Sequence, residues 1–363
     1  MTTLNATREE RFDEARASAF AERVAAALDA GAVTVMLSIG HRTGLFDVMA
    51  GLPPATSEQI AERAELAERY VREWLAVMVT GGIVEYDPAG TTYCLPAEHA
   101  ACLTRNAPLG NLAVYSQHVA LMGQVQDQVL ACFESGAGTQ YGDYPCFHQI
   151  MAEDSGQTVT AQLFHSVLPL VDGLEQRLAR GIDVLDAGCG RGTALIALAE
   201  RFPASRFVGY DLCEDAIAHA RRSVASAGLA NIRFTRRDLS GYDDTDCFDL
   251  ITSFDAVHDQ KDPQALIASL HGALRSDGIY LMQDIGGSAR LENNLDFPLA
   301  SLLYAVSCVH CTPISLGQGG AGLGTMWGWE TAQRMLEEAG FAPVTRHVLP
   351  HDPTNVWFVG VKS

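Results

Sequence analysis

Short apolar runs alternate with helical segments over the second half of the sequence. From residue 182 onward, β-rich runs occupy residues 183–187, 206–210, 232–235, 248–253 and 279–283, with helical segments over 193–201, 214–227 and 263–274 between them. This alternation is typical of βαβ units and predicts an α/β fold with a mainly parallel sheet. The last stretch differs, because a helix over 329–340 precedes two β-rich runs, 342–349 and 356–361, that predict a closing hairpin.

A glycine-rich loop follows the first of these runs and opens the first helix. Residues 184–193 read V-L-D-A-G-C-G-R-G-T, with glycines at positions 188, 190 and 192. Glycine permits a sharp turn and lets a ligand approach the backbone closely. The dinucleotide fingerprint G-x-G-x-x-G would place its third glycine at position 193, where this chain has Thr193. The spacing therefore does not fit a dinucleotide site.

The motif D-x-G-x-G-x-G, which begins at Asp186, resembles the first motif of the class I S-adenosylmethionine-dependent methyltransferases. The resemblance runs from about residue 180 to residue 363. It implies a Rossmann-like, seven-stranded methyltransferase sheet whose seventh strand is antiparallel, in agreement with the predicted hairpin. It also implies S-adenosyl-L-methionine as the cofactor and S-adenosyl-L-homocysteine as its product.

Acidic residues at the ends of the next two runs support this cofactor. Asp211 lies about 20 residues past the glycine loop, where a carboxylate can bind a ribose diol, although NAD sites use the same device. In the resembled family, an Asp at the position of Asp238 accepts from the adenine amino group, and the residue at the position of Leu239 packs on the ring. The residues expected to bind the cofactor are Asp186, Gly188, Cys189, Gly190, Gly192, Asp211, Leu212, Asp238, Leu239, Phe254 and Asp255.

His258 is the candidate catalytic residue. It follows the fourth run, and ligands of open α/β sheets bind beyond the carboxyl ends of the strands. In small-molecule O-methyltransferases that also carry a winged helix, a His-Asp-Trp sequence lies at this place and the His acts as base. This chain has Gln260 where those enzymes have Trp. His258 is therefore expected to act as a base or orienting group, or else to cap the following helix.

A long segment, residues 286–328, precedes the last helix and contains a dense run of glycines. Insertions at this place form part of the substrate pocket in related enzymes. The pair Cys308 and Cys311 stands alone, so plain packing, a pocket-lining thiol, and metal or redox chemistry all remain open, and no metal site is expected. The candidate substrate residues, each of which could instead simply pack, are Tyr144, His148, His310, Cys311 and Trp327.

The first hundred residues predict a mainly helical winged-helix domain. Helices are expected over residues 11–30, 33–39, 58–64 (capped by Thr56 or Ser57) and 67–80, followed by strands at 83–86 and 91–95. The expected organisation is a winged-helix and dimerisation domain over 1–100, a helical linker over 101–180 and an S-adenosylmethionine-binding domain over 181–363.

The composition of the chain restricts the kinds of partner and the compartment that we expect for it. The formal charge of −19 disfavours nucleic acid, and the nine cysteines, an odd number, favour reduced thiols in a cytoplasm. The N-terminus lacks the apolar region of a secretory signal, and no apolar stretch is expected to reach the roughly 18 residues that a membrane span needs. A cytoplasmic protein without a membrane partner is expected.

The leading hypothesis is a methyltransferase that acts on an O, N, S or C nucleophile of a small molecule. The whole chain resembles uncharacterised bacterial two-domain methyltransferases, whose N-terminal domain usually forms a homodimer. One alternative is an S-adenosylmethionine-binding transcriptional regulator, although residues 67–80 set only Arg69 and Arg72 against two glutamates. The other is a thiol or metalloid methyltransferase that uses Cys308 and Cys311.

Overall fold

The computed structural model describes residues 12–107 and 110–363, and the chain divides into two compact units, Met1–Val119 and Ala120–Ser363. The segment 101–180, predicted as a linker, is divided between them: its first part belongs to the first unit and its larger part to the second.

The first unit has the helix, helix, hairpin layout of a winged helix. Its elements are α1 (Glu14–Thr43), α2 (Leu45–Ala50), α3 (Ser57–Ala64), α4 (Glu68–Thr80), β1 (Glu85–Asp87), β2 (Thr92–Cys94) and α5 (Ala97–Leu103). Thr56 caps α3, as its side chain accepts from the Gln59 amide and the Gln59 side chain accepts from the Thr56 amide. Phe46 and Trp74 pack edge to face in the core, where burial of aromatic surface stabilises the unit.

The long helix α1 corrects the prediction of two separate helices over 11–30 and 33–39. One helix runs through Gly31 and ends only where Gly44 adopts a left-handed backbone with φ of 76°. A single glycine inside a helix costs about 1 kcal/mol, which does not end a helix of this length. Arg11, the predicted first residue, lies outside the described residues.

Two helical stretches correct the expectation that no apolar segment is long enough to cross a membrane. Glu14–Thr43 and Ala300–Gly317 contain windows with mean hydropathy of 1.5 and 1.3, which meet the length and composition of a span. Length and composition are weak evidence by themselves, since core helices and signal sequences meet the same description.

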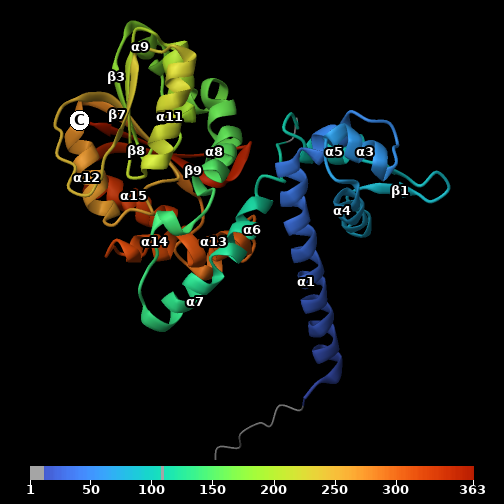
Figure 1. Cartoon of the computed structure of the whole chain (residues 1–363). Coiled ribbons are helices and arrows are strands. Elements are labelled where there is room, and N and C mark those ends of the chain that lie inside the picture. The colour runs from blue at the N-terminus through green and yellow to red at the C-terminus, as the bar shows by residue number, and fades with distance from the viewer. Residues whose placement is uncertain (1–11, 108–109) are drawn as a thin grey trace, which may run out of the picture. The chain divides into compact units, whose positions relative to one another are not determined.

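The second unit is built on one seven-stranded sheet in the order β5-β4-β3-β6-β7-β9-β8. Figure 1 labels β3, β7, β8 and β9 of this sheet. The strands are β3 (Asp183–Ala187), β4 (Arg206–Asp211), β5 (Ile232–Arg236), β6 (Phe248–Phe254), β7 (Leu274–Ile285), β8 (Phe341–Leu349) and β9 (Asp352–Lys362). The first five are parallel, and β9 pairs antiparallel with both β7 and β8. The predicted α/β sheet with its antiparallel terminal hairpin is confirmed.

Helices cover both faces of this sheet. Val184 belongs to a core with α10 (Thr193–Arg201) and α11 (Glu214–Ala227), whereas its neighbour Leu185 belongs to a core with α12 (Pro263–Ala273) and α15 (Trp329–Glu338). Successive strand residues point to opposite faces, so both must be apolar. The remaining elements are α6 (Ser116–Gln124), α7 (Gln126–Ser135), η1 (Tyr141–Asp143), α8 (Phe147–Thr158), η2 (Thr160–Gln162), η3 (Leu163–Val167), η4 (Leu168–Leu170), α9 (Leu174–Arg180), η5 (Leu291–Asn294), α13 (Ala300–Val306), η6 (Ser307–Cys311) and α14 (Thr312–Gly317).

The strand order reverses at β3. The chain builds β4 and β5 on one side of β3 and β6 and β7 on the other, so the loops that leave β3 and β6 diverge at the carboxyl edge of the sheet. A crevice at such a switch point is where open α/β sheets bind their ligands.

Candidate active site

A cavity lies at this switch point. It is lined by the loops that follow β3, β4, β5 and β6 and, on its other side, by η1 and α8. The lining side chains and backbone come from Tyr141, Phe147, His148, Met151, Ala152, Ser155, Val159, Asp186, Gly188, Cys189, Gly190, Arg191, Thr193, Ala194, Asp211, Leu212, Arg237, Asp238, Leu239, Phe254, Asp255, Ala256, Asp259, Gln260 and Gln318.

The three glycines of the loop have different structural roles. Each has a positive φ, between 52° and 80°. A Cβ on Gly188 would lie 2.5 Å from the Cβ of Ala256, and one on Gly192 would overlap the ring of Phe234. A Cβ on Gly190 would meet no other described residue within 4 Å. Gly188 and Gly192 are therefore required by packing, whereas Gly190 leaves space open beside the cavity.

Asp211 fixes the glycine loop from the end of β4. One carboxylate oxygen accepts from the Gly190 amide at 2.9 Å, and the other accepts from the Cys213 amide at 2.8 Å. Asp186, at the end of β3, is buried and accepts from the Thr252 hydroxyl at 2.8 Å. Burial raises the pKa of Asp186 to about 7.

The end of β5 contributes three consecutive lining residues. Asp238 accepts from the Ser240 amide at 2.8 Å, and Leu239 is buried. The Arg237 guanidinium lies 5.0 and 4.6 Å from the ring centroids of Tyr210 and Tyr242, a cation–π arrangement that fixes it at the wall. Arg237 was not predicted as a site residue, although it directly precedes the Asp-Leu pair.

The predicted cofactor residues meet in this one cavity. Ten of the eleven line it, and the exception is Gly192, which packs on Phe234. The open face of Gly190 and the carboxylate of Asp211 are what an adenosine-type ligand with a ribose diol requires. The residues present fit S-adenosyl-L-methionine, while their individual contacts with it remain predictions.

His258 lies outside the residues that line the cavity, although it was predicted to be catalytic. It is 2% exposed. Its Nδ1 lies 2.8 Å from a carboxylate oxygen of Asp284, and its Nε2 lies 3.2 Å from one of Asp259. Burial alone would lower the pKa of His258, but these two carboxylates outweigh it and raise that pKa well above its usual range. Both ring nitrogens thus face anions.

Asp284, which sequence reasoning missed, holds this arrangement together. It is fully buried at the end of β7. Its Oδ1 also accepts from the Ile285 amide at 2.8 Å and from the Trp327 indole at 3.0 Å. A charged residue at the carboxyl end of an apolar run was the signal that could have found it. The predicted substrate residue Trp327 thus contacts Asp284 behind the cavity wall.

Most of the other predicted substrate residues form a packed aromatic group rather than lining the cavity. The imidazole of His310 stacks on Phe147 with ring centroids 3.9 Å apart. The Tyr144 hydroxyl donates to the Val309 carbonyl at 2.7 Å. Cys311 is buried and accepts from the Thr325 hydroxyl at 2.9 Å, while Cys308 is exposed. Both thiols belong to the π-helical turn Ser307–Cys311, but only that of Cys311 is buried.

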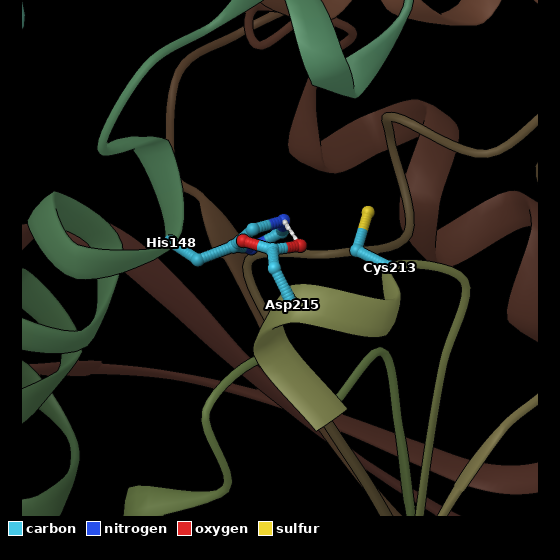
Figure 2. A group of neighbouring side chains, drawn as sticks. All are labelled: His148, Cys213 and Asp215. Atoms are coloured by element: carbon cyan, nitrogen blue, oxygen red, sulfur yellow. Dashed lines mark ion pairs between the residues drawn. The ribbon is translucent and has the colours of Figure 1, made fainter. Parts of the chain in front are cut away.

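His148 is the one predicted substrate residue that lines the cavity. Its ring stacks on Tyr141, and its Nε2 lies 3.8 Å from a carboxylate oxygen of Asp215. Figure 2 shows His148 from α8 and Asp215 from α11 turned toward one another, with Cys213 beside them. Among the described residues, these three could hold a metal ion, as could two groups around His258. The side chain of Asp215 is 73% exposed, which is typical of an ion pair at the edge of a site.

Comparison with known proteins matches both units to protein families. Residues 178–340 match the family model of a methyltransferase domain, and residues 31–105 match that of an Rv2258c-like winged HTH domain. Over 193 residues the chain is 26% identical to methyltransferase ungE' of Aspergillus campestris, covering 49% of this chain and 52% of that protein. Over 125 residues it is 32% identical to trans-aconitate 2-methyltransferase of Variovorax paradoxus, covering 34% and 44%. The chain spans a fifth to about half of the length of the first curated relatives.

Solved structures share the fold of nearly the whole chain. Human N-acetylserotonin methyltransferase in complex with S-adenosylmethionine has a TM-score of 0.66 at 15% identity, covering 98% of this chain and 99% of that one. An O-methyltransferase family protein from Burkholderia thailandensis has a TM-score of 0.64 at 16% identity, covering 91% and 94%. At such identities the likeness establishes the fold alone.

The methyltransferase family model covers strands β3 to β7 and most of the residues that line the cavity. Residues 178–340 are a methyltransferase domain, and residues 31–105 are a winged helix-turn-helix domain. The family match and the cavity support S-adenosyl-L-methionine as the cofactor.

Proposed function

We propose that the chain catalyses transfer of the methyl group of S-adenosyl-L-methionine to a nucleophile of a small molecule. The observation that carries this proposal is the single cavity in which the glycine loop, Asp211, Asp238 and Asp255 meet. Among O, N, S and C nucleophiles a hydroxyl oxygen is favoured, because the named neighbours in fold include O-methyltransferases.

The residues of the cavity would bind and orient the two reactants. S-adenosyl-L-methionine, when bound, supplies a methyl group activated by its sulfonium. Asp211 and the open backbone at Gly190 would hold the adenosine part, and Asp238 with Leu239 would bind the adenine. Tyr141, Phe147 and Met151 form the opposite wall and would exclude water. Alignment of two bound reactants supplies much of the rate of a displacement.

For His258 we favour the orienting role over the role of base. Two carboxylates face its two ring nitrogens, and they stabilise the imidazolium, which has no lone pair to accept a proton. Its burial behind the cavity wall supports the same assignment. In this role His258 holds Asp259 and Asp284 at fixed positions at the carboxyl ends of β6 and β7.

We favour a small molecule as the methyl acceptor, and we do not expect the winged-helix domain to bind nucleic acid. Arg69 and Arg72, the basic residues of α4, form ion pairs with Glu73 and Glu68 of the same helix. These pairs and the charge of −19 oppose binding of phosphates. Phe20 and other apolar residues of α1 are exposed, and an exposed apolar surface is typical of protein interfaces. This surface supports a homodimer.

A cytoplasmic location without a membrane partner remains part of the proposal. All nine cysteines are free, which suits a reducing compartment.

Calorimetric titration tests the proposed function. The full chain is titrated with S-adenosylmethionine, S-adenosylhomocysteine and NAD, together with Asp211→Ala and the exposed control Asp29→Ala. Micromolar binding of both adenosyl ligands, lost in Asp211→Ala and kept in the control, is expected. Binding of NAD alone would refute the methyltransferase assignment.

A further inference from the structure

We propose that Asp255 is the catalytic residue that accepts the proton of the acceptor's hydroxyl group, and that His258 is a positioning residue held as a cation behind it. This inference rests on the proposed function. As the O–H bond breaks, its proton goes to a carboxylate oxygen of Asp255 and its electron pair forms the new O–CH3 bond. The electron pair of the broken S–CH3 bond stays on sulfur, which leaves S-adenosylhomocysteine.

Asp255 is placed in the cavity by an unusual backbone conformation. It directly follows β6 and has a φ of 53°, in the left-handed region that residues with a Cβ rarely adopt. Its amide donates to the Gln283 carbonyl of β7 at 2.9 Å, which holds this conformation. Backbone conformations of this kind gather at functional sites. The result is a carboxylate that lines the cavity with 23% of its side chain exposed.

The carboxylate of Asp255 has an acceptor position that the protein does not use. Its Oδ1 is buried, and no hydrogen-bond donor from residues 12–107 or 110–363 reaches it. The nearest ring nitrogen, Nδ1 of His258, is 3.9 Å away and lies 2.8 Å from Asp284 instead. An unpaired, buried oxygen leaves the negative charge of the carboxylate poorly stabilised, so the carboxylate binds a proton more readily, and the exposed part of the side chain can receive that proton from the cavity.

The electrostatic surroundings of Asp255 suit a proton acceptor. Burial raises the pKa of Asp255 to about 7. The charge of His258 lowers that pKa, while Asp284 from β7, Asp154 from α8 and Asp259 from its own loop raise it. A base is most effective when its pKa lies near the operating pH, because the base is then ionised and still holds the proton it receives.

The other acidic and basic groups nearby suit this role less well. His258 is the cation described above. Charge pairing with that cation outweighs burial and lowers the pKa of Asp259 to about 2, which makes its carboxylate a weak base. Asp186 lines the cavity too, but it is 3% exposed and already accepts from Thr252. Among these groups, Asp255 combines exposure to the cavity, an unused acceptor atom and a suitable pKa.

The first test measures protonation directly in the full chain with saturating S-adenosylhomocysteine. Aspartates are labelled with 13C at the carboxyl carbon and histidines with 15N, and the Asp255 signal is assigned by its loss in Asp255→Asn. We expect Asp255 to titrate near pH 7 and the His258 ring to stay doubly protonated at pH 8. Titration of Asp255 near its ordinary value of about 4, or a neutral His258 ring at pH 7, would overturn the proposal.

The second test uses two phenols of different acidity as acceptors. Phenol keeps its proton at pH 8, whereas 4-nitrophenol is largely ionised and needs no base. At saturating S-adenosylmethionine, Asp255→Asn should lower kcat with phenol by about 10²–10⁴-fold but lower kcat with 4-nitrophenol far less. Equal losses with both phenols would overturn the role as base. His258→Gln should shift the pH–rate profile to higher pH, because a cation that lowers the pKa of Asp255 is removed.

Failure of this inference and failure of the proposed function have different signatures. A chain that binds no S-adenosylhomocysteine contradicts the proposed function. A chain that binds it but methylates neither phenol at any pH contradicts the assignment of Asp255 to a hydroxyl acceptor. If His258→Gln does not fold, the protonation of His258 in the unmodified chain still decides its role.

Discussion

The ring of Phe234 occupies the space in which a side chain on Gly192 would lie. Gly192 is the last residue of the glycine loop and directly precedes α10, while Phe234 belongs to β5, two strands away from β3. Packing of the loop against the sheet therefore requires glycine at position 192. At Gly190 no such packing exists, and glycine instead leaves open space beside the cavity.

Alanine at these two glycines should separate packing from binding. Gly192→Ala should destabilise the second unit by roughly 1–3 kcal/mol, because the methyl group overlaps the ring and φ is 73°. Gly190→Ala should fold but lose at least about tenfold in affinity for S-adenosylhomocysteine, equivalent to about 1.4 kcal/mol. Urea unfolding and calorimetry provide the two readouts. Normal affinity in Gly190→Ala would mean that the open face binds no ligand.

Asp352 should make the stability of the second unit depend on pH. It is 1% exposed, its Oδ1 accepts from Asn355 at 2.8 Å, and its Oδ2 has no partner among the described residues. Burial, with a smaller contribution from the charge of Asp154, raises the pKa of Asp352 to about 7. Because this value lies above that of the unfolded chain, about 3.9, stability falls as pH rises from about 4 to 7.

Asp352→Asn should remove this part of the pH dependence. The variant should gain roughly 1–3 kcal/mol over the unmodified chain at pH 8, since the full ionisation cost of about 4 kcal/mol is partly offset by an unpaired amide N–H. Urea unfolding at pH 5 and pH 8 measures the free energy of unfolding of both proteins, and Asp296→Asn, at an exposed position, is the control. An equal slope of stability against pH in both proteins would contradict the buried, neutral carboxyl.

The two thiols of the Cys308-Val-His-Cys311 segment should behave differently. Cys308→Ser should change stability by less than about 0.5 kcal/mol because the thiol is exposed. Cys311→Ser should cost about 1–2 kcal/mol, since the buried sulfur accepts from Thr325 and packs in a filled site. Loss of methyl transfer in the Cys308→Ser variant, with S-adenosylhomocysteine binding intact, would instead favour the thiol or metalloid alternative.

The capping box of α3 offers a test in the first unit. Thr56→Ala removes the hydroxyl that accepts from the Gln59 amide and should cost about 1 kcal/mol. Thr80→Ala is the matched control, because the Thr80 hydroxyl donates only to carbonyls of its own helix, those of Ala76 and Val77. Urea unfolding of both variants gives the comparison, and equal losses would show that the cap contributes nothing special.

The sheet could be predicted closely from the sequence because its signals are local. The strand over residues 183–187 and the helices over 193–201 and 214–227 have the predicted bounds. The central strands β3, β6 and β7 are mostly buried on both faces and therefore read as apolar runs, which composition marks. The continuous α1 was mispredicted because an isolated glycine is a weak signal for a helix end.

The surroundings of His258 could not be predicted, because they depend on tertiary contacts. Asp284 and Trp327, which contact each other behind the cavity wall, are 43 residues apart, and Asp284 lies 26 residues from His258. The motif His258-Asp259 therefore indicated a proton acceptor, whereas its long-range partners favour a fixed cation. Of the cavity wall formed by η1 and α8, only His148 was predicted, because the other lining residues of that wall are mostly apolar or aromatic and could equally well pack in a core.

The position of β9 between β7 and β8 has a consequence for synthesis of the chain. The edge of β7 from Ile279 to Ile285, including Asp284, pairs with residues 355–361, which a ribosome produces some seventy residues later. Until then this apolar strand exposes a row of unpaired backbone groups, the usual starting point of aggregation. Nascent chains of this protein, and any message cut short before codon 352, should depend on chaperones that cover that edge.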